Sequence, residues 1–199
     1  MSAAQSDIEI LKQSVNHFLP ITDEEFALSD GFWHTKTYKK GEFYNDFKQV
    51  CKHLGFVLNG VFRTYYVDEK SGDEKNIYFY THNQIVVSYA SFINQVPCHY
   101  YTQAMVDSRV VYIHIENLMK LYQKSHIWER FGRLIAEQAS NIALDRTESL
   151  LFRSPEERYL NLVSQHPDII NSIPLYHISS YLGIQGPSLS RIRKRIAMK

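Results

Sequence analysis

Between residues 32 and 115, short runs of β-branched and aromatic residues follow one another with no long helical segment between them. Two of these runs, 55–67 and 76–80, are separated by residues 68–73, where Gly72 can adopt the positive φ of a tight hairpin turn. Further runs occupy residues 84–87, 100–105 and 109–115. Neighbouring parallel strands would need long crossover connections, usually helices. The spacing therefore predicts an antiparallel β-sandwich or barrel and disfavours a parallel α/β sheet.

Two helical patterns precede the strands. Residues 8–18 carry an apolar stripe at helical spacing and predict a helix that ends before Pro20. Thr22 followed by Glu25 has the form of a capping box, which predicts the start of a second, short helix.

Residues 127–152 contain no Pro and predict one helix of about 25 residues, which is roughly 37 Å long at 1.5 Å per residue. A helix of that length extends beyond a small sandwich, so its stripe needs another partner. The stripe consists of Trp128, Phe131, Leu134, Ile135, Gln138 and Ile142. We interpret it as the seam of a symmetric homodimer. The alternative is a helix that lies across its own domain.

Residues 173–196 predict two short helices that begin near Pro174 and Pro187. Gly183 between them can adopt the left-handed conformation that a turn of about three residues requires. The expected inner faces carry Leu175, Ile178, Leu182, Leu189, Ile192 and Ile196. Two helices joined by a short turn with a glycine are the pattern of a helix-turn-helix.

The outer face of the second helix is polar and basic. It carries Ser188, Ser190, Arg191, Arg193, Lys194 and Arg195. From residue 160 to the end, five Lys or Arg stand against one Asp, a net charge of +4, although the whole chain carries only +1. Short polar groups near the start of a helix, followed by Arg and Lys, suit a helix that enters the major groove. The expected partner is double-stranded DNA, and the alternatives are a generic helical hairpin and a solvated C-terminus.

Ser154 before Pro155, with Glu157 at the third helical position, is typical of a helix start and marks a boundary after the long helix. The predicted division is a sensor domain at 1–126, a dimerisation helix at 127–152 and a DNA-binding domain at 153–199. The predicted fold class is α+β: an antiparallel β-roll with flanking helices, a long central helix and an all-α C-terminal domain.

Residues 154–167 and 173–196 resemble the C-terminal domain of the Crp/Fnr transcription regulators. Upstream, Gly41-Glu42 is similar to an early turn of the family's cyclic-nucleotide-binding β-roll, and residues 57–63 are similar to its strand-Gly-strand turn. The resemblance covers nearly the whole chain. It implies a β-roll sensor, a long helix that pairs two protomers, and two recognition helices on a palindromic operator, with RNA polymerase as a further candidate partner.

The chain departs from the family at the start of the recognition helix, where Gly186 and Pro187 replace a polar pair. The operator of better-known relatives is therefore not carried over. A second interpretation is a small-molecule-binding β-roll module whose DNA-binding domain is degenerate.

The resemblance also identifies a candidate effector pocket. In cyclic-nucleotide binders of this family, a Gly-Glu pair takes the ribose and the Arg of a later Pro-Arg pair binds the phosphate. Ser88-Tyr89 and Pro97-Cys98 stand at these positions here. A buried phosphate charge needs a cation that Cys98 does not supply, so we expect neither cAMP binding nor a cofactor. The candidate pocket comprises Tyr78, Ser88, Tyr89, Pro97, Cys98 and Tyr100, either filled by its own rings or open to an unknown small effector.

Other function classes find no support in the sequence. The two cysteines, Cys51 and Cys98, are too few for a four-thiolate metal site, and neighbouring residues such as Cys98 and His99 point to opposite faces of a strand. We expect no metal site.

No P-loop, Rossmann glycine pattern or Ser-His-Asp order is present, so we expect no catalytic residue and no enzyme. Without a signal peptide pattern or an apolar run of ~18 residues, a cytoplasmic protein that does not contact membranes is expected.

Overall fold

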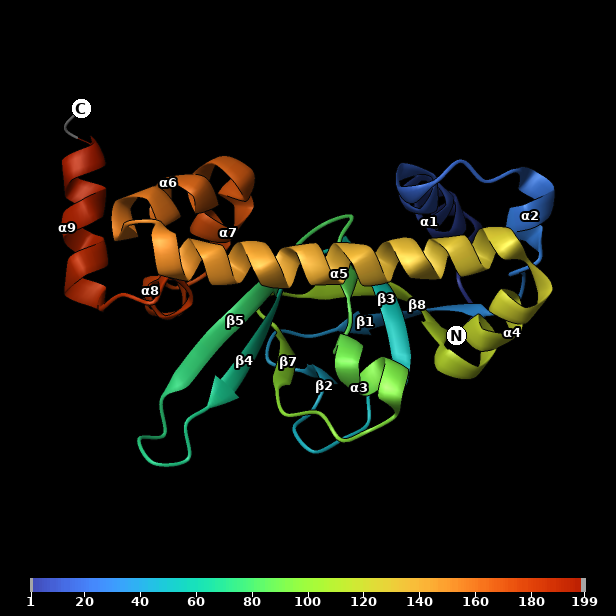
Figure 1. Ribbon diagram of the computed structural model, residues 1–199, viewed down its shortest axis with the longest axis horizontal. Coiled ribbons are helices and arrows are strands. Elements are labelled where there is room, and N and C mark those ends of the chain that lie inside the picture. The colour runs from blue at the N-terminus through green and yellow to red at the C-terminus, as the bar shows by residue number, and fades with distance from the viewer. Residues whose placement is uncertain (1, 198–199) are drawn as a thin grey trace.

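The computed structural model describes residues 2–197, the side chain of Asp168 excepted. A β-roll occupies the middle of the molecule, and helix α5 runs along it to a group of C-terminal helices (Figure 1). The helices are α1 (Gln5–Phe18), α2 (Asp23–Ala27), α3 (Tyr89–Asn94), α4 (Ile115–Lys124), α5 (His126–Phe152), α6 (Pro155–Gln165), α7 (Pro167–Ser172), α8 (Leu175–Leu182) and α9 (Gly186–Ala197). The strands are β1 (Trp33–Tyr38), β2 (Phe43–Asn45), β3 (His53–Asn59), β4 (Phe62–Val67), β5 (Glu74–Tyr80), β6 (Ile85–Val86), β7 (Tyr101–Ala104) and β8 (Ser108–His114).

Within residues 2–197, the strands form two antiparallel sheets of four strands each. One sheet has the order β1-β8-β3-β6 and the other β2-β7-β4-β5. The turn between β3 and β4 depends on Gly60, whose φ is 100° and whose Cα faces the side chain of Ser108 so closely that a Cβ atom would lie 2.1 Å from Ser108 Oγ. Gly72 has a φ of 76° in the β4–β5 hairpin, as its position in the sequence predicts. The predicted antiparallel roll is therefore confirmed.

Both helix starts with a capping box are confirmed. The Thr22 hydroxyl accepts from the Glu25 backbone N–H, and the Glu25 carboxylate accepts from the Thr22 N–H, at the start of α2. Ser154 and Glu157 make the same pair of bonds at the start of α6. Each box satisfies backbone donors that would otherwise lack a partner at the helix end.

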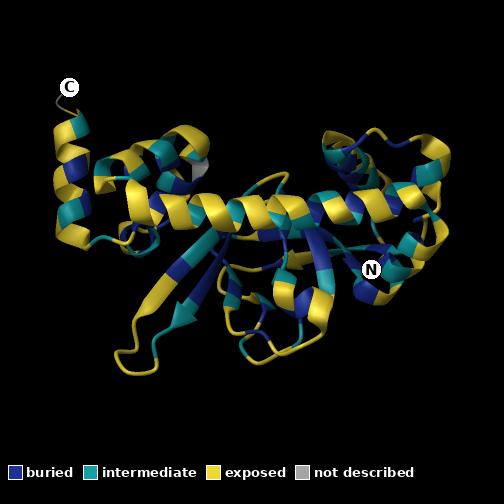
Figure 2. Ribbon diagram, in the orientation of Figure 1, coloured by how far each residue is buried: buried dark blue, intermediate teal, exposed yellow. Residues whose placement is uncertain are grey.

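The first half of α5 belongs to the main core, which lies between the β1-β8-β3-β6 sheet and helices α1 and α4. Trp128 and Phe131 are fully buried there, and the Phe131 ring stacks on Phe56 of β3 with 6.2 Å between the centroids. The Trp128 indole N–H donates to the backbone carbonyl of Glu25, 2.9 Å away. The alternating burial along this half of α5 is visible in Figure 2.

The predicted dimer seam is therefore wrong at Trp128, Phe131 and Ile135, whereas at the less buried Gln138 and Ile142 it stays a prediction. Trp128, Phe131 and Ile135 are buried in the chain's own core, and Leu134 packs against the same core. Gln138 and Ile142 face a cavity of the same chain. Helical periodicity locates an apolar stripe but not its partner, and here the partner is the β-roll.

The C-terminal helices share a second core with one end of the β-roll. Leu162, Ile169, Ile178, Leu182 and Leu189 are buried there. Val61, Phe79 and Met105 of the β-roll belong to the same cluster. Leu175, predicted on the inner face of α8, is instead 38% exposed, because that face begins at His177 and Ile178. No helix in residues 2–197 is long and apolar enough to cross a membrane.

Candidate functional site

Helices α8 and α9 are joined by a tight turn at residues 183–185. Gly183 is left-handed, with a φ of 65°, and its N–H donates to the carbonyl of Ser180 at 3.1 Å. The N–H of Ile184 donates to the carbonyl of Ser179 at 3.0 Å. Leu189 and Ile192 of α9 are buried, as predicted. These contacts fix α9 relative to α8 and leave its opposite face open.

The open face of α9 carries the residues that the sequence singles out. Ser190, Arg191, Arg193, Lys194 and Arg195 are exposed, and Ser188 is half-buried. The Arg191 guanidinium donates to the Ser188 hydroxyl at 3.2 Å. Helix α9 lies at the end of the molecule opposite α2 and α4, and Figure 2 shows its outward face exposed. The structure thus brings all six predicted side chains together on one short helix.

Arg195 differs from the other cations of α9 because it is held within the chain. Its guanidinium donates to the carboxylate of Glu156 near the start of α6. Arg191, Arg193 and Lys194 make no ion pair with any carboxylate in the described part of the chain. Three of the four cations are therefore available to an anionic partner without breaking an existing pair.

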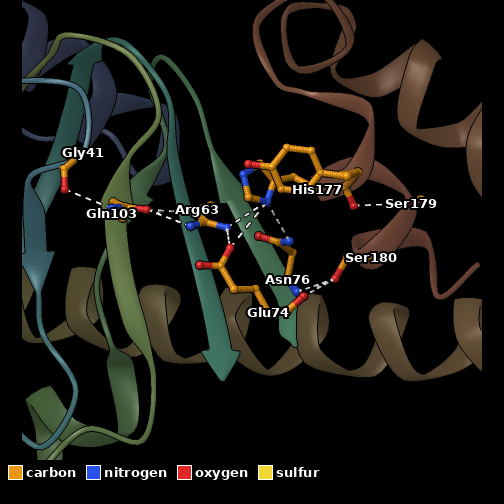
Figure 3. Close-up of polar contacts among 9 residues, drawn as sticks. Gly41, Arg63, Glu74, Asn76, Gln103, His177, Ser179 and Ser180 are labelled. Carbon is orange, nitrogen blue, oxygen red and sulfur yellow. Dashed lines mark hydrogen bonds and ion pairs between the residues drawn. The ribbon is translucent and has the colours of Figure 1, made fainter. Parts of the chain in front are cut away.

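Helix α8 is joined to the β-roll by a polar cluster, which we call the Arg63 cluster (Figure 3). Its members are Arg63, Glu74, Asn76, Gln103, His177 and Ser180. The Arg63 guanidinium, 5% exposed, donates to the Glu74 carboxylate at 2.5 Å and to His177 Nδ1 at 2.7 Å. The Ser180 hydroxyl donates to the backbone carbonyl of Glu74 at 2.8 Å.

The protonation state of His177 follows from its partners. A guanidinium has only donors, so Nδ1 must accept, which requires a neutral imidazole with its proton on Nε2. Burial, and then the charge of Arg63, lower the pKa of His177 to about 4, against the weaker opposing effect of Glu74. Sequence reasoning missed this cluster, because Arg63 and His177 stand far apart in the chain and the motifs that contain them do not indicate a contact between them.

A cavity of about 750 Å³ lies between the β-roll and α5. The structure brings all six predicted pocket residues to its walls: Tyr78, Ser88, Tyr89, Pro97, Cys98 and Tyr100. The pocket is therefore open rather than filled by its own rings. Burial raises the pKa of Tyr80, another wall residue, to about 12, so its phenol stays protonated and its hydroxyl donates to the Val87 carbonyl at 3.3 Å.

The walls at the positions of the phosphate cassette carry no charge. Cys98 is buried, and its thiol donates to the backbone carbonyl of Tyr100 at 3.2 Å. Ser88 precedes α3 without capping it, and its buried hydroxyl has no hydrogen-bond partner in the described part of the chain. Among the described wall residues, Arg146 of α5 is the only lysine or arginine.

Comparison with known proteins identifies the fold. No protein-family model and no curated protein matches the sequence. FixK2 from Bradyrhizobium japonicum matches with a TM-score of 0.69 and 15% identity, over 83% of this chain and 85% of that one. A protein assigned to the Crp/Fnr regulators from Eubacterium rectale matches with a TM-score of 0.68 and 19% identity, over 92% and 88%. The c-di-GMP-responsive global regulator CLP of Xanthomonas campestris matches with a TM-score of 0.66 and 17% identity, over 89% and 92%.

These matches confirm the resemblance at the level of the fold. The chain shares the antiparallel β-roll, the flanking helices and the long helix with Crp/Fnr-type structures over most of its length.

Proposed function

We propose that this chain is a DNA-binding transcription regulator of the Crp/Fnr type, in which α8, the turn and α9 form a helix-turn-helix. The observation that carries the proposal is the outer face of α9. Its inner side chains are anchored in a core, and its outer face presents four cations and two serines on a helix whose sequence contains no acid. A rigid helix with this face suits insertion into the major groove of a duplex.

The side chains of α9 have distinct expected roles. Arg191 is the main candidate to read a guanine edge, because it is exposed one turn beyond Ser188. Arg193 and Lys194 are candidates for phosphate contacts, which position the protein rather than select a sequence. Arg195, paired with Glu156, is expected to contribute least.

The dimer interface is proposed on the face of α5 that points away from the β-roll. Leu144 and Leu151 are 58% and 69% exposed and lie seven residues, or about two turns, apart on this face. Large apolar side chains of this exposure on one stripe are typical of a surface that another chain covers. The occupant we propose is the same face of a second copy, which would give two α9 helices related by a two-fold axis.

For the roles of the domains, we keep the division that the sequence predicts. Residues 1–126 would be the sensor, 127–152 the dimerisation helix and 153–199 the DNA-binding domain. We expect no tight cAMP binding, because Cys98 supplies no cation at the cassette position and Arg146, the only lysine or arginine among the described wall residues, belongs to α5 instead.

A mobility-shift titration with the duplex upstream of the protein's own coding region tests the proposal. We expect binding at ~50 mM salt that weakens steeply toward ~200 mM, because phosphate contacts release counterions. Absence of binding at low salt, or binding without a salt dependence, would contradict the proposal.

A further inference from the structure

The chemistry of the cavity walls restricts what the cavity can bind. No Asp or Glu is among the described residues that line it. Tyrosines, amides, histidines and apolar side chains make up most of the surface, and Arg146 supplies one permanent positive charge. Walls of this kind favour a ligand with an apolar body and a single negative charge and disfavour a cation.

Arg146 is a cation without a carboxylate partner. No described carboxylate forms an ion pair with it, and neighbouring Asp145 is paired with Arg153 at 2.9 Å. Instead, the Arg146 guanidinium donates to the backbone carbonyl of Tyr181 and lies 4.0 Å from the centroid of the Tyr181 ring. The Arg146 side chain is half-buried, and this burial lowers the pKa of its guanidinium. A half-buried guanidinium with a neutral partner gains more from an anion than an exposed one does.

One wall of the cavity is long enough for an extended molecule to lie along it. Its α5 wall runs from Ile135 to Arg146, which corresponds to about 16 Å along the helix axis. Tyr78 and Tyr80 of β5 line the cavity as well, with ring centroids 4.8 Å apart in an edge-to-face arrangement. Arg146 therefore stands at one end of a long wall, and the aromatic rings are available to the body of the ligand.

We infer that the cavity binds an organic acid whose carboxylate pairs with Arg146 while its aromatic body lies between α5 and the tyrosines of β5. A carboxylate at this position competes with the Tyr181 carbonyl for the same guanidinium. Tyr181 belongs to α8, so a carboxylate that draws the guanidinium toward the cavity would weaken a contact between α5 and α8. The expected consequence is a change in the affinity of α9 for DNA; this second step rests on the proposed function, whereas ligand binding does not.

Calorimetry with defined probes tests the binding step on the full chain. The probes are 2-naphthylacetate, its uncharged amide 2-naphthylacetamide, decanoate and cAMP. We expect 2-naphthylacetate to bind at one site per chain, the amide to bind at least about tenfold more weakly, and cAMP to give no heat. Tighter binding of decanoate than of 2-naphthylacetate would contradict the inference that the body of the ligand is aromatic. Failure of both acids to bind would overturn the whole inference.

Variants of Arg146 separate charge recognition from folding. Arg146→Gln should remove the preference for the acid over the amide, and Arg146→Lys should retain part of it. Arg130→Gln, an exposed position of the same helix outside the cavity, should bind both probes as the wild type does. An unchanged ratio of acid to amide affinity in Arg146→Gln, in a protein that unfolds at the wild-type temperature, would exclude the proposed pairing.

Mobility shifts with and without saturating 2-naphthylacetate test the consequence for DNA. We expect at least about a fivefold change in affinity for the wild type and none for Arg146→Gln, as is typical of coupling between two sites. If the acid binds but the apo protein never binds DNA, the proposed function fails and the ligand site stands. If the protein binds DNA with the expected salt dependence but binds no acid, the inferred ligand site is wrong and the proposed function stands.

Discussion

At the scale of single residues, Arg191 is the side chain on which sequence-specific binding should depend most. Replacing it with Ala should weaken binding to the specific duplex by ~1–3 kcal/mol if it reads a base edge. Arg195→Ala should cost less, because that guanidinium is already paired with Glu156. Fluorescence anisotropy on specific and scrambled duplexes measures both.

Lys70→Ala is the matched control for these variants. Lys70 is an exposed cation of the β4–β5 hairpin, away from α9, so its removal should leave DNA affinity unchanged. An Arg191→Ala variant that binds the specific duplex as tightly as Lys70→Ala does would show that α9 is docked differently.

His177 should make the stability of the protein depend on pH. Its pKa of about 4 lies below the ordinary value of 6.5, so the unfolded chain binds a proton more readily than the folded one. The stability contributed by the neutral ring is fully present above pH 6.5 and is lost as the pH falls toward 4. Between pH 7 and pH 5, His177→Gln should lose ~1–2 kcal/mol less stability than the wild type, because Gln does not titrate.

Urea unfolding at the two pH values gives this difference directly. His126→Gln, at a fully exposed position that begins α5, is the control and should follow the wild type. Identical pH dependence for the wild type and His177→Gln would mean that the ring does not accept from Arg63.

At the scale of elements, the two faces of α5 should respond differently to substitution. Phe131→Ala empties a fully buried site and should cost about 3–5 kcal/mol of stability with no specific effect on association. Leu144→Asp together with Leu151→Asp places charges on the exposed face and should give monomers of nearly wild-type stability. Thermal unfolding and sedimentation equilibrium distinguish the two outcomes. Dimers that persist in the double variant would refute this interface.

Local elements could be predicted from the sequence, and their partners could not. The capping boxes at Thr22 and Ser154, and the turn glycines Gly72 and Gly183, depend on a few adjacent residues and were found at the predicted places. The face that α5 presents to the β-roll depends on residues distant in the chain. An amphipathic stripe fits a dimer seam and a domain core equally well, so periodicity alone did not choose between them.

At the scale of the whole molecule, the proposed dimer constrains the operator. Two α9 helices related by a two-fold axis should reach successive major grooves about 34 Å apart, or a multiple of that distance. Moving two half-sites apart by half a helical turn, ~5 bp, should therefore reduce affinity at least about tenfold. Anisotropy on such duplexes measures the effect. The monomeric Leu144→Asp, Leu151→Asp variant should be insensitive to the spacing, and a spacing-independent wild type would contradict the dimeric arrangement.

The candidate site could be predicted only in part, because some of its contacts join residues that are distant in the chain. The side chains of α9 and the walls of the cavity were found from the motifs and from the resemblance to Crp/Fnr regulators. The contacts that connect these two regions, Arg63 with His177 and Arg146 with Tyr181, join distant parts of the chain through single polar side chains. Such pairs leave no periodic signal in a sequence.

Helix α5 is supported unevenly: its first half rests on packed aromatic rings and its second half borders a cavity. We therefore expect the first half of this continuous helix to resist bending more than the second half does. Backbone amides near Phe131 should exchange with deuterium only on global unfolding, whereas those near Ala143 should exchange through local opening and slow down when the cavity is filled. The hydrogen-exchange gradient along α5 would thus record cavity occupancy without any reference to DNA.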